Sequence, residues 1–158
     1  MKHHVYLSLT VLALASSLSW SGVEKKIELN EVPDNIMATA KEMMTEAKYL
    51  SANTETEDDG TTVFEIQGKL PDGRKVEVDI FANGDVEEIE VEFTRDLVPG
   101  AVLNAIEKKL PGFQATYIEA SHSKSKKVVQ YELVGKVGET PMDLEVSADG
   151  RKIIISDQ

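Results

Sequence analysis

The same short motifs occur twice along this chain of 158 residues, and this repetition constrains the fold more than any other feature. A Val-Pro step, an aromatic-Glu-x-x-Gly stretch and an Asn-Gly or Asp-Gly turn each recur 66 or 67 residues later. The matched positions are Val32-Pro33 with Val98-Pro99, Phe64-Glu65-x-x-Gly68 with Tyr131-Glu132-x-x-Gly135, and Asn83-Gly84 with Asp149-Gly150. Their order and spacing predict two copies of one structural unit, residues 32–97 and residues 98–158.

Each unit opens with a pattern typical of a helix. Apolar residues recur at helical spacing, and Pro33 suits the first helical turn, where its missing N–H would lack a partner anyway. In the second unit, Pro111-Gly112 ends the pattern. We expect the following apolar residues in the core: Ile36, Ala40, Met43, Met44 and Ala47 in the first unit, and Val102, Leu103, Ile106 and Leu110 in the second.

Four strands are predicted after each helix, because apolar and polar residues alternate with a period of two. Asn83-Gly84 predicts a two-residue hairpin turn in which both residues have positive φ. The expected strands cover residues 48–54, 61–69, 76–81 and 88–93 in the first unit, and 114–121, 127–137, 142–146 and 151–156 in the second.

A single helix on four strands makes a thin core, so we expect the two units to join. Edge-to-edge pairing would give an α+β fold of two α-β-β-β-β repeats, with one continuous antiparallel sheet of about eight strands and both helices on one face. This arrangement would also protect two sheet edges. The short segment 22–31 is expected to fray or to pair at an edge.

The first 21 residues have the pattern of a secretory signal peptide. After a short basic start, residues 5–18 form a run of apolar and small residues that is too short to span a bilayer, which needs about 20 apolar residues. Small residues then favour cleavage before Gly22, and Ala13-Leu14-Ala15 leaves an earlier cut open. We therefore expect a periplasmic or secreted protein with no stable membrane anchor.

Composition excludes several classes of chemistry. Without cysteine, the chain has no disulfide, no thiolate zinc site and no cysteine nucleophile. A net charge of −11 argues against nucleic acid and anionic membranes as partners. His122 is the one histidine outside the leader, and its polar surroundings predict an exposed turn residue. No nucleophile elbow or phosphate loop occurs, so we expect neither an enzyme nor a cofactor.

Two acidic stretches have a superficial likeness to metal sites. Asp79-x-Phe81-x-Asn83-Gly84-x5-Glu90 fits four EF-hand positions, but Phe81 stands where an oxygen ligand is needed and the flanks read as strands. We interpret it as a hairpin. Adventitious calcium at Glu57-Asp58-Asp59 is less favoured than a solvated loop, so no metal site is predicted.

The repeated motifs resemble those of PepSY-like domains. The resemblance rests on the Val-Pro helix start, the aromatic-Glu-x-x-Gly strands at 64–68 and 131–135, and the strands ending in Ala-x-Gly at 77–84 and 143–150. The tandem arrangement after a leader is similar to exported PepSY-like proteins with a beta-lactamase-inhibitor-protein-like fold. This resemblance implies an inhibitor or protein-binding role without catalytic residues. Beta-lactamase-inhibitor protein grips its target with an open sheet face, and it has disulfides that this chain lacks.

The acidic residues of the first unit fall on one strand parity, away from the helix. Residues 32–97 contain 6 Lys+Arg and 17 Asp+Glu, whereas residues 98–158 contain 8 of each. Paired carboxylates are common in this pattern, but exposed positions are not expected to have the raised pKa that general acid–base catalysis needs. The candidate partner-binding residues are Glu65, Glu77, Asp79, Phe81, Glu88 and Glu90.

Two interpretations of this acidic face remain open. It can be a solubilising surface, or it can be a docking surface for a basic partner. The leading hypothesis is an exported, non-enzymatic binding module, an inhibitor of a periplasmic or secreted enzyme, whose partner is another exported protein or peptide. The alternative is a periplasmic small-ligand or cation-binding sensor. Oligomeric state is left open.

Overall fold

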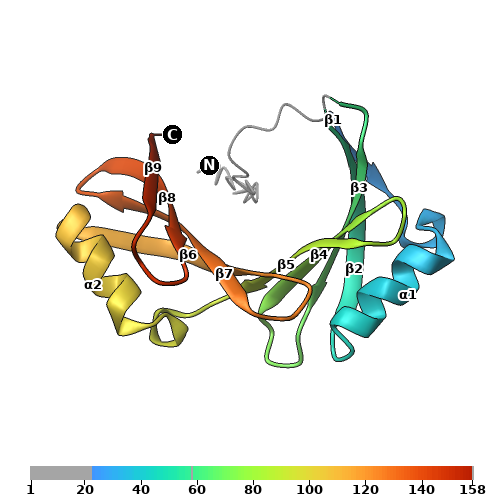
Figure 1. Cartoon of the computed structure of the whole chain (residues 1–158), viewed down its shortest axis with the longest axis horizontal. Helices are drawn as coiled ribbons and strands as arrows, with labels where there is room; N and C mark the ends of the chain where they lie inside the picture. Colours follow the sequence, from blue (N-terminus) through green and yellow to red (C-terminus); the bar gives the residue numbers. More distant parts are fainter. Residues whose placement is uncertain (1–22, 58, 158) are drawn as a thin grey trace, which may run out of the picture.

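The computed structural model describes residues 23–57 and 59–157, which form one sheet and two helices (Figure 1). The expected signal peptide and its cleavage site lie outside these residues. Nine strands form a single antiparallel sheet, in which the spatial order of the strands equals their order along the chain. They are β1 (Val23–Ile27), β2 (Lys48–Thr56), β3 (Thr62–Lys69), β4 (Lys75–Phe81), β5 (Val86–Glu92), β6 (Phe113–His122), β7 (Val128–Val137), β8 (Thr140–Ser147) and β9 (Ile153–Asp157).

The order of elements confirms a helix followed by four strands in each part of the chain. A short 3-10 helix precedes each α-helix: η1 (Leu29–Glu31) precedes α1 (Asp34–Met43), and η2 (Arg95–Leu97) precedes α2 (Gly100–Lys109). The sheet has nine strands rather than about eight, because β1 pairs with β2 at the sheet edge. That the two halves are copies of one structural unit stays a prediction.

The two helices begin and end in closely similar ways. Pro33 and Pro99 stand at the N-caps with extended backbones, as their fixed φ angle favours. Met44 and Leu110 leave helical geometry at the C-caps, with ψ of 74° in both, and each donates its N–H to the carbonyl four residues earlier. No helix among the described residues is long and apolar enough to cross a membrane.

The core lies between the sheet and the helices, in two connected clusters. The first contains Ile36 of α1 and the buried valines and isoleucines of β4 and β5, and Met43 and Met44 pack against its border. The second contains Val102 and Ile106 of α2 with the buried residues of β6, β7 and β8. Phe93 packs against both clusters, so both helices lie on the same face of one sheet.

The two halves of the sheet incline toward one another, so the face opposite the helices is concave (Figure 1). α1 and α2 lie on the outer side, and α1 packs on β3 and β4. Neither helix covers the concave side. We call this side the open face.

The turn between β4 and β5 differs from the expected two-residue hairpin. Phe81 donates its N–H to the carbonyl of Asp85 at 2.9 Å, and Gly84 donates to the carbonyl of Phe81 at 2.8 Å, so three residues form the loop. Gly84 has a φ of 91°, whereas Lys126 is the one non-glycine residue with positive φ in the described ranges. Asn83 therefore keeps a negative φ, and its Oδ1 accepts the N–H of Asp85 at 2.9 Å. Three-residue loops that end on a left-handed residue are the next most common hairpin connection after the two-residue turns.

The glycines of the two aromatic-Glu-x-x-Gly motifs have a steric role. A Cβ atom added to Gly68 would lie 2.7 Å from the carbonyl oxygen of Lys48. One added to Gly135 would lie 2.6 Å from Cζ of Phe113 and 2.9 Å from Cα of Ala115. Each glycine faces an irregularity in the neighbouring strand, in β2 for Gly68 and in β6 for Gly135. The glycine of each motif is thus required because the backbone of the neighbouring strand lies too close to leave room for a side chain.

We predict that Gly135→Ala destabilises the protein by about 2 kcal/mol or more, because the new methyl group meets backbone and an aromatic ring that cannot both move away. Urea denaturation measures the free energy of unfolding. Gly100→Ala is the matched control, because a Cβ there meets nothing within 4 Å and alanine favours a helix. Equal stability of Gly135→Ala and the wild type would contradict the steric explanation.

Candidate functional site

Cross-strand register brings carboxylates face to face across the middle of the open face. Glu77 on β4 is directly opposite Glu90 on β5, and Glu119 on β6 is directly opposite Glu132 on β7. Like charges in such positions repel and destabilise a sheet. Further opposed acidic pairs are Glu65 with Asp79, Asp79 with Glu88, Glu92 with Glu119, and Glu132 with Glu145. The row therefore crosses from the first half of the chain into the second.

Five of these residues form two tight groups that share one member. Carboxylate oxygens of Glu77, Asp79 and Glu90 lie within 4.8 Å of one another, and so do those of Glu90, Glu119 and Glu132. We call these five residues the carboxylate cluster. All five side chains are partly buried, so water screens their mutual repulsion less than it would on an exposed surface.

Burial and mutual repulsion together raise the pKa values of the carboxylate cluster. Burial, followed by the charge of Glu65, raises the pKa of Glu77 to about 7. Burial and the Glu119 charge raise the pKa of Glu90 to about 10 and that of Glu132 to about 7. The expectation that these alternating carboxylates keep ordinary pKa values is wrong, because neighbouring side chains on the concave sheet desolvate them.

Asp79 and Glu119 complete the cluster with different surroundings. The pKa of Asp79 lies well above its usual range, chiefly through burial and next through the charge of Glu77. Burial also raises the pKa of Glu119, but a hydrogen bond from Tyr117 and the nearby Lys75 charge oppose this rise. Ionising the cluster without a counter-charge is therefore unfavourable.

Two buried oxygen atoms, one within the carboxylate cluster and one beside it, have no hydrogen-bond partner. They are Oδ1 of Asp79 and Oγ of Ser121. Ser121 is 0% exposed, and it lies opposite Glu90 on one side and Gln130 on the other. Because side chains alternate along β6, Ser121 shares the open face with Glu119. Buried polar atoms without a partner are rare in proteins and call for an explanation.

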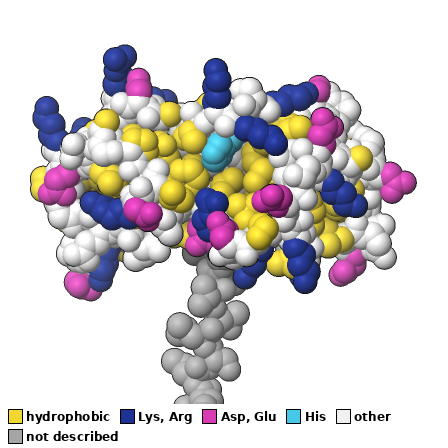
Figure 2. All heavy atoms as spheres, turned by 90° about the horizontal axis from the view of Figure 1, so that it is seen from below, with side chains coloured by type: hydrophobic (Ala, Val, Ile, Leu, Met, Phe, Trp, Pro, Cys, Tyr) yellow, Lys and Arg dark blue, Asp and Glu magenta, His cyan; other side chains and the backbone are white. Residues whose placement is uncertain are grey.

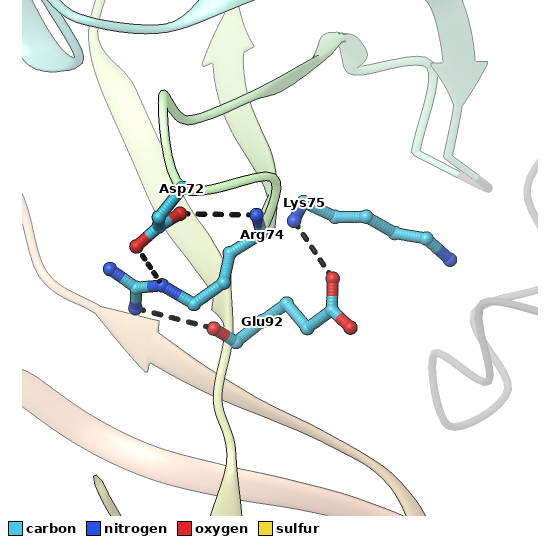
Figure 3. Close-up of polar contacts among 4 residues, drawn as sticks. All are labelled: Asp72, Arg74, Lys75 and Glu92. Carbon is cyan, nitrogen blue, oxygen red and sulfur yellow. Dashed lines mark hydrogen bonds and ion pairs between the residues drawn. The ribbon is translucent and has the colours of Figure 1, made fainter.

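Cations lie at the border of the cluster rather than in it. Figure 3 shows the start of β4, where the backbone N–H of Lys75 donates to Oε2 of Glu92 at 2.9 Å and Arg74 pairs with Asp72 at 2.7 Å. Nζ of Lys75 lies 5.0 Å from the ring centroid of Tyr117. Among residues 23–57 and 59–157, none of the ion pairs includes a member of the carboxylate cluster.

Of the residues expected from the sequence, Glu77, Asp79 and Glu90 come together in the cluster. Glu65 and Glu88 lie on the same face, each opposite Asp79. Phe81, at the end of β4, is partly buried beside a shallow hollow of about 400 Å³ lined by Thr61, Thr62 and neighbouring turn residues.

Sequence reasoning missed Glu119, Glu132 and Ser121 as members of the site. Alternation alone places all three on the open face, but their distance from β5 depends on how β6 pairs with it. The register from Ile89 opposite His122 to Glu92 opposite Glu119 makes this connection. No local motif encodes that register, so these residues could have been found only by predicting correctly how β5 pairs with β6.

The expectation of an exposed turn histidine is wrong. His122 is the last residue of β6, is partly buried and lies opposite Ile89 on the helix side. Because carbonyl oxygens only accept, Nδ1 must donate toward the carbonyls of Ala120 at 2.8 Å and Ile89 at 3.2 Å. Figure 2 shows this side of the molecule, with apolar side chains gathered round the histidine. His122 therefore lies on the side away from the carboxylate cluster.

The EF-hand-like stretch is a hairpin, as expected, because Asp79 lies in β4 and Glu90 in β5. Both residues nevertheless belong to the first carboxylate group, through the sheet rather than through a calcium-binding loop. The acidic loop expected to be solvated includes Asp58, which lies outside the described residues.

No protein-family model and no curated protein matches this sequence. Solved structures do resemble it. A DUF2874 family protein from Bacteroides uniformis superposes with a TM-score of 0.60 at 18% identity, over 79% of this chain and 88% of that one. A BLIP-like protein from Bacteroides fragilis gives a TM-score of 0.60 at 19% identity, over 79% of this chain and 85% of that one. The chain has a BLIP-like fold.

A more distant match is a periplasmic protein of unknown function from Bacteroides vulgatus, with a TM-score of 0.39 at 19% identity. It covers 86% of this chain and 99% of that one. Because the identities are low, the two structures with a TM-score of 0.60 support the BLIP-like fold and nothing further. In this chain, the strand register places the carboxylate cluster in the middle of the open face.

We predict that the protein becomes less stable as pH rises from about 5 to about 8 in a buffer containing EDTA. An unfolded glutamate titrates near 4.5, whereas folded Glu77 titrates at about 7, so the unfolded chain binds fewer protons between these values and rising pH favours unfolding. This one group would cost on the order of 3 kcal/mol once ionised in both states. Melting temperature measured across this range checks the slope.

The variants Glu77→Gln and Glu55→Gln provide the contrast. Glu77→Gln removes one repelled carboxylate and should flatten the pH dependence of Tm. Glu55 lies on β2 opposite Val63, outside the carboxylate cluster, so Glu55→Gln should change the slope less than Glu77→Gln does. A wild-type Tm that rises or stays level over this range would contradict the raised pKa values.

Proposed function

We propose that this chain is an exported, non-enzymatic binding protein that engages a basic protein or peptide through its open face. One observation carries the proposal: a broad concave sheet face that neither helix covers bears a continuous row of carboxylates. A surface that only confers solubility would disperse its charges, whereas these carboxylates are opposed and partly buried.

The charge distribution supports a cationic partner. Lysine and arginine side chains of a docked segment would offset repulsion within the cluster, so binding and folding would favour one another. Acidic side chains across such an interface would also steer encounter and select against acidic partners. Phe81 and Tyr117, both partly buried, add aromatic surface at the borders of the row.

A binding role fits the shape of the surface better than catalysis does. Catalytic pockets enclose most of their substrate, whereas the carboxylate cluster lies on an open sheet. The raised pKa values of Glu77 and Glu132 would suit a general acid, but His122, the single described histidine, lies on the opposite side. We therefore keep the non-enzymatic assignment.

Export and the tandem PepSY-like assignment, which are part of the proposal, rest on the sequence. The leader-like residues 1–21 support export to the periplasm or beyond, and the doubled motifs support a tandem PepSY-like protein. The BLIP-like fold supports an inhibitor role, because the resemblance to beta-lactamase-inhibitor protein implies a target held on the open face. A cation-binding protein is the second candidate, and the clustered carboxylates favour it.

We predict that Glu77→Lys/Asp79→Lys loses exported partners that the wild type captures, since the substitution reverses charge in the middle of the open face. Partners retained from a periplasmic extract are identified by mass spectrometry, in low salt and in high salt. We expect the lost partners to be basic and to elute in high salt, because salt screens exposed charges.

Glu42→Lys/Glu107→Lys is the matched control. It changes the net charge by the same amount at exposed positions on α1 and α2, away from the open face. Circular dichroism establishes that each variant is folded, and Glu88→Gln/Glu90→Gln serves as a milder change if lysine disrupts the sheet. The same captured partners in all variants would reject the open face as the docking surface.

A further inference from the structure

The middle of the open face has the geometry of a cation site. Two oxygens bound to one calcium ion at about 2.4 Å can lie at most about 4.8 Å apart. The oxygens of Glu77, Asp79 and Glu90 satisfy this limit together, and so do those of Glu90, Glu119 and Glu132. Glu90 belongs to both groups and is the natural shared ligand.

A second observation points to a ligand at the same place. Ser121 is 0% exposed, its hydroxyl has no hydrogen-bond partner, and it lies directly opposite Glu90 on the open face. Oδ1 of Asp79 is likewise buried without a partner. An ion held by Glu90 and its neighbours would place a positive charge beside both oxygens and satisfy them.

The chemical type of the ligand atoms indicates which kind of ion the site would bind. Every donor in the two groups is oxygen, His122 lies on the other side of the sheet, and the chain has no cysteine. Carboxylate and hydroxyl oxygens suit hard cations rather than zinc or copper. Calcium accepts irregular arrangements of six to eight oxygens, whereas magnesium demands a near-ideal octahedron that facing strands do not provide.

We propose that the carboxylate cluster binds calcium, with Glu90 as the shared ligand and the Ser121 hydroxyl beside the ion. The site extends from β4 to β7, so it takes ligands from both halves of the chain. It goes beyond the proposed protein-binding role and does not depend on it. Calcium would relieve the repulsion between the opposed carboxylates and hold β5 against β6.

The test is calcium titration of the whole exported protein at about pH 7.5, by isothermal calorimetry and thermal melting, after removal of metal with EDTA. We expect Kd of about 10⁻⁴ M, which is typical of extracellular calcium modules. Calcium at about 10 mM should then raise Tm by about 8 °C. No heat of binding and an unchanged Tm at this concentration would overturn the proposal.

Two variants locate the ion. Glu90→Gln should melt higher than the wild type without calcium, because folding no longer has to bury a carboxyl group among other carboxylates, and it should lose at least tenfold in calcium affinity. Glu55→Gln, on the same face but outside the cluster, should bind calcium as the wild type does. Glu132→Gln is the second cluster variant, with an expected loss in the same direction. Undiminished calcium affinity in both cluster variants would overturn the assignment.

Magnesium and partner capture complete the test. An equal rise in Tm with magnesium chloride would overturn the choice of calcium. Capture of exported partners is compared in EDTA and in calcium, with the same wild-type bait. Absence of calcium binding with intact capture would remove this inference alone, whereas calcium binding without any capture would remove the proposed docking function alone.

Discussion

The pairing of β5 with β6 is the interaction on which the rest of the molecule depends. Four residues of each strand face one another, from Ile89 with His122 to Glu92 with Glu119. This short contact converts two thin helix-on-sheet layers into one nine-stranded sheet, and Phe93 joins the two cores beneath it. On the other face, the same pairing brings Glu119 and Glu132 to Glu90. Structural continuity and concentrated negative charge therefore have a common origin.

The two faces of this junction have opposite effects on stability. On the helix side, burial of Ile89, Val91 and Ala120 stabilises the fold, at about 25 cal/mol for each Å² of apolar surface removed from water. On the open face, carboxylates with raised pKa values face one another across the strands and destabilise the folded state at neutral pH. A bound cation or a basic partner would remove this destabilisation. Apolar burial on one face thus compensates for an unfavourable charge arrangement on the other. Such an arrangement is expected at a binding surface rather than at a surface without a function.

Much of the fold follows from local pattern. Alternation of apolar and acidic residues places Glu77, Asp79 and Glu90 on one face, and the motif glycines are where backbones approach closely. What local pattern does not contain is long-range register: Glu119 and Ser121 join the site only because β6 aligns with β5 in one way. Burial is likewise a property of the assembled concave sheet, so the raised pKa values could not be foreseen. His122 was misplaced for the same reason, since the strand continues further than its polar neighbours suggest.

The strand order also has a consequence for how the protein acquires its structure. Two neighbouring pairs in the sheet have a helix between them: η1 and α1 separate β1 from β2, and η2 and α2 separate β5 from β6. The other neighbouring pairs are joined by short connections. Contacts between sequence neighbours form quickly, and contacts that close longer loops form slowly. We therefore expect β2 to β5 and β6 to β9 each to assemble first as a series of hairpins, and the β1–β2 pairing and the β5–β6 junction to close afterwards. Glu90 then meets Glu119 and Glu132 only when the junction closes, after much of the apolar burial has been gained, so ionic conditions should govern how fast that step occurs.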